Sequence, residues 1–197
     1  MVGAPPAFYA GNNYPAFALA WKDREPVIYA GTNDGMLHAF KVSDGSEVFA
    51  IIPKNLLGKL KNLRSTHEFY VDGSPKAADI YSLTGSTWKT VIITGERGGG
   101  PYYFAVDVTD PLNPDYPKIL WEWTDLKMGD AWAKPEIGKI KDGTDTRYVA
   151  FVTGGYSTSN NVSNSVYVID IYTGTTLKEW TNLGSPDNKI QIGRAHV

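Results

Sequence analysis

The 197-residue chain carries a net charge of −2 and contains 20 Gly, 12 Pro and 13% aromatic residues, including six Trp. This small, unclustered charge gives no indication of binding to nucleic acid or to an anionic membrane, and no apolar run approaches the roughly 18 residues of a membrane-spanning helix. The absence of Cys excludes a disulfide scaffold, a zinc ribbon and a thiol nucleophile. Frequent turn residues and aromatics instead favour an all-β fold with many short strands.

The first 25 residues are predicted to be mostly irregular, because Pro, Gly and Asn interrupt them repeatedly. Residues 1–6 lack the basic start and the apolar core of a signal peptide. Ala16 to Trp21 is apolar enough for a short strand or a helical turn.

Residues 26–51 predict three short strands joined by two tight turns. Gly35 can supply the positive φ that the first turn needs. Leu37 and Ala39 share one face of the second strand. Two hairpins in succession make a meander, which is the unit of a propeller blade. The three strands are expected at 27–30, 36–42 and 47–51.

The same unit recurs twice when Val42, Val108 and Ile171 are set as equivalent. Each is preceded by an aromatic residue or His, a small or apolar pair and a polar residue, and each is followed by a turn. The offsets of 66 and 63 residues exceed the about 40–50 residues that are usual for a four-stranded blade. We therefore predict a partial, quinoprotein-like β-propeller of about three blades, each with a loop insertion. The alternative is ordinary β-rich sequence whose common turns look alike. The blade motifs lie near 26–51, 101–123 and 165–180.

One short inserted helix is predicted near 55–63. Leu56, Leu60 and Leu63 fall on one helical face, with Lys on the other, despite Gly58 in the middle. This pattern indicates an insertion that packs its leucines against a sheet.

Further strands are predicted along the rest of the chain. Residues 67–75 alternate, with Phe69 and Val71 on one face, and end in a turn. Residues 90–94 are continuously apolar or β-branched, as in a buried strand. Trp121 and Trp123 share a strand face, where we expect them to pack between blades. The remaining strands are expected at 77–81, 101–106, 134–140 and 147–153.

No stretch carries a recognised catalytic, cofactor-binding or metal-binding pattern. The glycine-rich residues 95–100 precede a strand and lack the Gly-Lys-Ser/Thr of a phosphate-binding loop. The turn at 142–145 lacks the full set of Asp residues of a calcium loop, so a solvated turn is the better interpretation. His38 and His67 are 29 residues apart and fit no metal-ligand spacing. A carboxylate pair stays open, but nothing singles out two residues. We assign no site residue and expect no enzymatic activity.

Both ends of the chain suggest an incomplete protein. Closed propellers typically need about 4–8 blades, and three would leave exposed sheet edges. We therefore interpret residues 1–190 as an incomplete propeller domain. The last six residues, Ile-Gly-Arg-Ala-His-Val, resemble the translation of a common sequencing adapter. We interpret residues 191–197 as a non-native tail and assign no role to His196.

Four blocks of the chain carry a resemblance in a fixed order. The first is 27–40, VIYAGTNDGMLHAF, and the others lie at 70–75, 88–91 and 103–111. Together they resemble the PilY-type family of type IV pilus biogenesis and tip-associated adhesin proteins. Looser similarity at 128–135 and 154–156 extends the resemblance over about residues 2–180.

The resemblance implies a piece of the C-terminal β-propeller domain of such a protein. Members are large, extracytoplasmic bacterial proteins that act at the pilus tip, cell surface, periplasm or outer membrane. Expected partners are minor pilins, other pilus tip proteins, and host or abiotic surfaces, in pilus biogenesis, adhesion and twitching motility. The family's Asp-rich calcium loop has no match in this chain, so the resemblance places any calcium in the missing part of the domain.

Partner contacts are expected on the insertions at 52–67, 109–118 and 154–164, because loops on a rigid scaffold carry recognition. The alternative is a quinoprotein-like propeller, either of a dehydrogenase that uses pyrroloquinoline quinone or of an outer-membrane assembly scaffold. Ala39 to Phe49 approaches the quinoprotein blade motif, but no vicinal Cys pair or set of cofactor ligands accompanies it.

Overall fold

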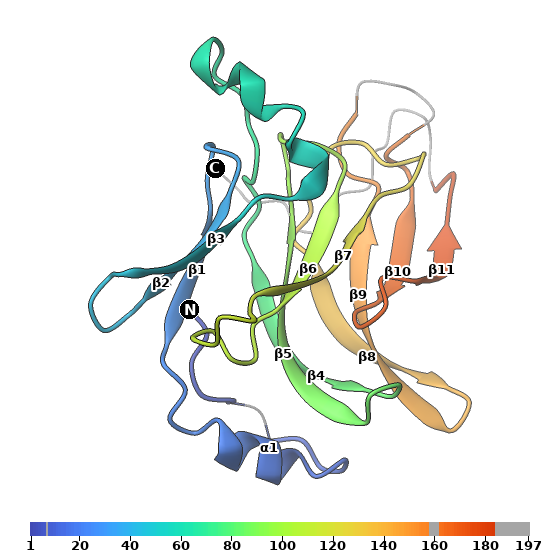
Figure 1. Cartoon of the computed structure of the whole chain (residues 1–197). Helices are drawn as coiled ribbons and strands as arrows, with labels where there is room; N and C mark the ends of the chain where they lie inside the picture. The colour runs from blue at the N-terminus through green and yellow to red at the C-terminus, as the bar shows by residue number, and fades with distance from the viewer. Residues whose placement is uncertain (7, 158–161, 184–197) are drawn as a thin grey trace.

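The computed structural model describes residues 1–6, 8–157 and 162–183, and it contains three antiparallel sheets with little helix (Figure 1). Most strands lie within about two residues of their predicted positions. In chain order they are β1 (Val27–Gly31), β2 (Leu37–Lys41), β3 (Glu47–Ile51), β4 (Lys76–Ser82), β5 (Thr87–Gly95), β6 (Tyr103–Asp107), β7 (Lys118–Trp123), β8 (Glu136–Asp142), β9 (Asp145–Thr153), β10 (Val166–Asp170) and β11 (Thr176–Trp180).

Each sheet is a meander in which consecutive strands pair antiparallel. The orders are β1-β2-β3, then β4-β5-β6-β7, then β8-β9-β10-β11. β4 lies against β8 and β9 of the next sheet. The all-β prediction of about three propeller blades is confirmed. The interpreted tail at 191–197 lies outside the described residues.

The strand register shows the internal repeat directly. A shift in pairing follows Ala39 in β2, Ala105 in β6 and Val168 in β10. These residues are equivalent in the sequence alignment, so an irregularity of this kind recurs at one position in every blade. The second and third sheets begin with an additional strand, β4 and β8. Among the described residues, the first sheet has no equivalent strand beside β1, and only Val2 forms a bridge there, with Val27.

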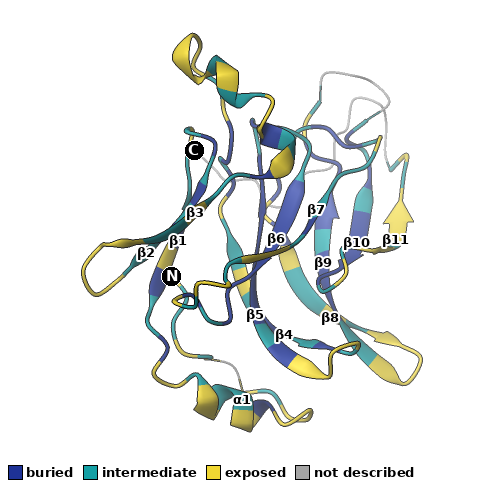
Figure 2. Cartoon of the chain, viewed as in Figure 1, coloured by how far each residue is buried: buried dark blue, intermediate teal, exposed yellow. Residues whose placement is uncertain are grey.

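Two hydrophobic cores fill the spaces between the sheets (Figure 2). β5 contributes to both, because Val91 and Ile93 face the core shared with the third sheet, whereas Ile92 faces the core shared with the first. A strand buried on both faces needs a continuous apolar run rather than an alternating one. This explains the pattern at 90–94 and confirms that the strand is buried.

Trp121 and Trp123 join the second blade to the third, as predicted. The indole Nε1 of Trp121 donates a hydrogen bond to the Ile171 carbonyl oxygen at 2.8 Å. That of Trp123 donates to Thr176 Oγ1 at 3.0 Å, and its ring packs edge-on against Tyr167 at 4.9 Å. Both side chains therefore combine apolar burial with a polar contact across the blade boundary.

The predicted helix near 55–63 differs in the structure. The segment forms two 3-10 helices, η1 (Lys54–Leu56) and η2 (Leu60–Arg64), separated at Gly58. Leu56 is buried, whereas Leu63 is 42% exposed, so no continuous leucine face forms. Pro53 at the start and glycine in the middle both weaken a regular α-helix, which explains the shorter pieces.

The one α-helix in the described part of the chain is α1 (Tyr14–Ala20), close to the predicted turn at 16–21. Pro15 suits its first turn, where no backbone N–H partner is lost. Tyr14 is buried and its hydroxyl donates to Asp79 Oδ2 at 2.6 Å, which ties the helix to β4.

Candidate interaction surface

Four loops gather at one end of the sheets, drawn at the top of Figure 1. They are residues 52–75, 96–102, 124–135 and the described parts of 154–165. Two of the predicted contact insertions, 52–67 and the described parts of 154–164, therefore lie at this end. The third, 109–118, connects β6 to β7 at the opposite end, so it belongs to a different surface.

The 52–67 insertion is anchored to the second blade by carboxylates. Glu122 on β7 accepts hydrogen bonds from the backbone N–H groups of Lys54 at 2.7 Å and Asn55 at 3.2 Å. The Lys59 ammonium group donates to the carbonyl oxygens of Phe69 and Gly99. The Glu122 bonds satisfy N–H groups at the start of η1, and the Lys59 bonds hold the insertion to the chain at 69 and 99.

Residues 67–75 do not form the predicted strand. They cross between the first two blades, with Tyr70 and Val71 both fully buried and Phe69 45% exposed. The backbone N–H of Val71 donates to Thr32, and that of Asp72 donates to Glu96. The alternation of apolar residues did not predict the structure here, because the segment packs against two sheets rather than pairing with one as a strand.

The glycine-rich loop after β5 serves close packing. A Cβ on Gly99 would lie far inside 3.0 Å of the Tyr70 carbonyl oxygen, and one on Gly98 would meet the Phe69 ring. The glycines therefore let the crossing segment approach the loop backbone. This packing requirement accounts for them without a phosphate ligand.

Arg97 projects from this loop with its backbone in the left-handed region, at φ 52°. Its guanidinium group lies over the Trp132 ring at 4.6 Å, and its Nε lies 3.9 Å from Asp72 Oδ2. Its backbone N–H donates to Ala131. The positive φ directs the side chain across the blade boundary, toward the third blade.

Three exposed aromatic side chains continue from this point across the same end. Phe69 packs against Gly98, Trp132 lies under Arg97, and Tyr156 pairs through its backbone with Asp130. Their exposed fractions are 45%, 36% and 46%. We call Phe69, Arg97, Trp132 and Tyr156 the aromatic rim. Aromatic and Arg side chains of this kind dominate protein interfaces, because they bury large areas with little loss of entropy.

The sequence did not single out the aromatic rim. Its aromatics resemble those of the core in type and spacing, and only their position on loops distinguishes them. A loop position was a usable signal for Trp132, which lies between predicted strands. Phe69 was assigned to a predicted strand, so its exposure could not have been anticipated.

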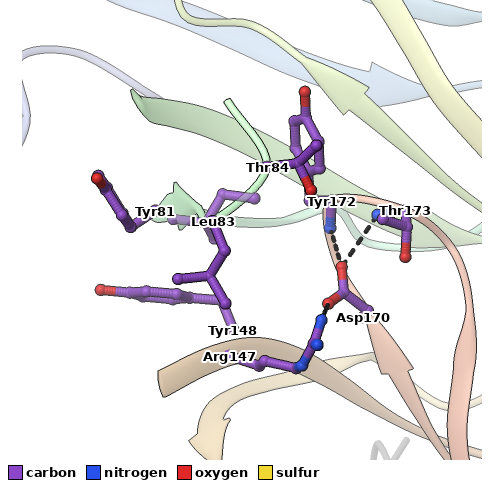
Figure 3. Close-up of a pocket in the computed structure, with 9 residues that line it drawn as sticks. Tyr81, Leu83, Thr84, Arg147, Tyr148, Asp170, Tyr172 and Thr173 are labelled. Atoms are coloured by element: carbon purple, nitrogen blue, oxygen red, sulfur yellow. Dashed lines mark hydrogen bonds and ion pairs between the residues drawn. The ribbon is translucent and has the colours of Figure 1, made fainter. Parts of the chain in front are cut away.

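A small pocket lies at the opposite end, between the second and third blades (Figure 3). Arg147 crosses it and forms ion pairs with Asp142 Oδ2 at 2.5 Å and Asp170 Oδ2 at 3.2 Å. Both bonds raise the pKa of Arg147, with Asp142 the larger cause. The second oxygen of Asp170 accepts backbone N–H groups of the next turn. The pocket is lined by Ile80, Tyr81, Leu83, Thr84, Arg147, Tyr148, Asp170, Tyr172 and Thr173.

The ion pair in this pocket is a repeated structural element. Asp170 on β10 corresponds to Asp107 on β6, whose carboxylate pairs with Lys89 on β5. Asp107 also closes the following turn through the N–H and hydroxyl of Thr109. Because the same pair recurs in two blades, it explains the pocket's charges without a ligand.

The first blade carries the corresponding charges in exchanged positions. Lys41 stands where the other blades have Asp, and Glu25 stands where they have Lys or Arg. The Glu25 carboxylate accepts a hydrogen bond from the hydroxyl of Ser43 in the turn at 2.7 Å. A carboxylate therefore fastens this turn in all three blades, although it comes from a different strand in the first.

The two internal histidines, which fit no metal-ligand spacing in the sequence, contact neighbouring side chains. His38 bonds to Glu47 Oε1 at 2.5 Å and Asp34 Oδ2 at 2.9 Å, and these contacts, led by that of Glu47, raise its pKa. His67 contacts Phe69 edge-on. Within the described ranges, no group of three His, Asp or Glu side chains is placed to hold a metal ion. No helix there is long and apolar enough to cross a membrane.

Comparison with known proteins identifies the family. The sequence model of the family described as "PilY1 beta-propeller domain" matches residues 4–185 of this chain. The chain belongs to the PilY1 β-propeller family. The resemblance found in the four ordered blocks is thereby confirmed.

Individual PilY1 proteins and a PilY1 structure agree with this assignment. The type IV pilus biogenesis factor PilY1 of Pseudomonas aeruginosa is 41% identical over 178 residues, which is 85% of this chain. A PilY1 homologue of Xylella fastidiosa is 38% identical over 173 residues. The crystal structure of the Pseudomonas aeruginosa PilY1 C-terminal domain matches with a TM-score of 0.78 and 35% identity, over 95% of this chain and 38% of that one.

The chain spans 14% of the length of these PilY1 relatives. The three sheets thus represent the propeller domain of a type IV pilus biogenesis factor. The family assignment favours this interpretation over a quinoprotein dehydrogenase or an outer-membrane scaffold.

Proposed function

We propose that this propeller is a non-catalytic module that presents the aromatic rim to partners in type IV pilus assembly. The observation that carries the proposal is the exposure of Phe69, Trp132 and Tyr156 together at one end of a rigid scaffold. Membership of the PilY1 family supplies the pilus context.

The partners fit the chemistry of the rim. A pilus component with an apolar surface and a carboxylate would bury the rings and pair with Arg97. We propose minor pilins or pilus tip proteins as these partners, and host or abiotic surfaces as targets of the assembled tip. In this proposal the whole protein acts outside the cytoplasm, at the pilus tip, cell surface, periplasm or outer membrane. It supports adhesion and twitching motility.

Replacing Phe69 and Trp132 together with Ala in the full-length protein tests the proposal. Each interface aromatic typically contributes about 1–2 kcal/mol, so the loss of two should lower partner affinity about 30- to 900-fold. We expect reduced surface pili, adhesion and twitching at an unchanged amount of secreted protein. These readouts are measured by shearing pili from cells, surface attachment and colony spreading.

Phe8→Ala is the matched control, because Phe8 is a fully exposed aromatic that precedes α1, away from the rim. It should leave all three readouts unchanged. Normal pili, adhesion and twitching in the double variant would rule out the aromatic rim as the contact surface.

A further inference from the structure

A fully buried glutamate holds the 52–67 insertion against the second blade. Glu96 follows β5 and has no exposed surface. Its Oε1 accepts a hydrogen bond from the side-chain amide of Asn55, in η1, at 2.8 Å. The contact joins residues 41 positions apart and fastens the insertion next to the aromatic rim.

Among the described residues, the second carboxyl oxygen of Glu96 and the amide oxygen of Asn55 lack a hydrogen-bond partner. These two atoms, Glu96 Oε2 and Asn55 Oδ1, are both buried. Gly100 lies directly against Oε2, where a Cβ would come within 2.7 Å. Two buried acceptors cannot satisfy each other, and each unpaired one destabilises the docked insertion.

One added proton changes this arrangement. A neutral carboxyl group is both a donor and an acceptor, as a carboxamide is. Protonated Glu96 could accept from the Asn55 amide with Oε1 and donate from Oε2 to Asn55 Oδ1. The two unpaired oxygens would then satisfy each other in a two-point pair.

We propose that Glu96 and Asn55 form a pH-sensitive lock, in which a proton on Glu96 holds the 52–67 insertion against the blade and its loss releases the insertion. The lock resides in the domain itself and does not depend on which partner binds the rim. It would make the shape of this end of the propeller respond to acidity outside the cell.

The surroundings of Glu96 favour its protonated, neutral form. Burial raises the pKa of Glu96 to about 7, and the charge of Glu122 on β7 acts in the same direction. The Asn55 bond, the Lys59 ammonium group on the insertion and the Tyr102 backbone oppose this shift. The Lys59 ammonium group also pairs with Glu68 and donates hydrogen bonds to two carbonyl oxygens.

The direction of the effect follows from linkage. A released Glu96 has an ordinary pKa of 4.5, below the value of about 7 in the docked state. The docked state therefore binds more protons between these two pH values, and docking weakens as the pH rises through that window. From pH 5 to pH 8, the equilibrium constant for release should rise on the order of 70-fold.

Hydrogen exchange of the full chain tests the lock. The backbone N–H groups of Lys54 and Asn55 donate to Glu122 on β7, so they lose these bonds when the insertion leaves the blade. After correction for intrinsic exchange, their protection should fall on the order of 70-fold from pH 5 to pH 8. In Glu96→Gln, which mimics the protonated side chain, protection should stay near the wild-type value at pH 5 throughout. In Asn55→Ala it should be low at both pH values.

Glu68→Gln serves as the matched control, because Glu68 directly follows the insertion and binds Asn62 and Lys59 in it. This variant should keep the wild-type pH dependence. His38, in the first blade, is a second group that gains a proton on acidification. A pH dependence that persists in Glu96→Gln and vanishes in His38→Gln would overturn the proposal. So would equal wild-type protection at pH 5 and pH 8. If Glu96→Gln fails to fold, infrared spectroscopy of the wild type at pH 6 tests the proposal instead. A protonated carboxyl band supports the lock, and the absence of this band refutes it.

Discussion

Replacing Asp107 with Ala is expected to lower the free energy of unfolding by about 3–5 kcal/mol. Asp107 is fully buried at the end of β6, paired with Lys89 and bonded to both the N–H and the hydroxyl of Thr109. Burial lowers the pKa of Lys89, but the bond and charge of Asp107 more than offset this and raise it. Removing the carboxylate leaves a largely buried ammonium group and an open turn. Urea denaturation followed by tryptophan fluorescence measures the change.

The repeat supplies a matched control in the third blade. Asp170→Ala removes the equivalent carboxylate, but Arg147 is a third exposed and keeps Asp142 as a second partner. The loss should therefore be smaller, about 1–2 kcal/mol. If the two variants were equally destabilised, burial of the pair would not be the deciding factor.

A Lys89→Met change added to Asp107→Ala should recover part of the stability, because no buried charge is then left unpaired.

Much of the fold could be predicted because it depends on local sequence signals. Turns with Gly35 and Gly174 mark strand ends, and both adopt positive φ. The repeat alignment also predicted which residues share a structural position, since the shift in register follows Ala39, Ala105 and Val168 alike. Fold and family therefore follow from short-range patterns repeated along the chain.

The candidate surface could not be predicted in the same way, because its features arise from contacts distant in sequence. Glu96 lies in a glycine-rich loop and looks like an exposed charge, yet the insertion some 40 residues earlier in the chain covers it. Leu63 matches a helical apolar face but points outward, since Pro53 and Gly58 divide the segment into 3-10 turns. Tertiary packing decided the burial of Glu96, whereas helix-breaking residues within the segment decided the exposure of Leu63.

Gly99→Ala is expected to destabilise the protein by about 3 kcal/mol, at the upper end of overpacking effects. A Cβ at this position would overlap the carbonyl oxygen of Tyr70, which is backbone and cannot rotate away. The crossing segment would have to move, although its residues Tyr70 and Val71 are both fully buried. Phe69 and Arg97 would shift with it, so binding through the aromatic rim should fall together with stability.

Gly58→Ala is the comparison that separates packing from chain stiffness. Nothing lies within 4 Å of a Cβ on Gly58, and its backbone conformation is open to any residue. Its substitution should be neutral or stabilise the protein by about 0.4–1 kcal/mol, because it restricts the unfolded chain. Thermal and urea unfolding of both variants measures the difference. Equal stability of the two would mean that the loop after β5 yields to the added methyl group, and that its glycines are not required by the close approach of Tyr70.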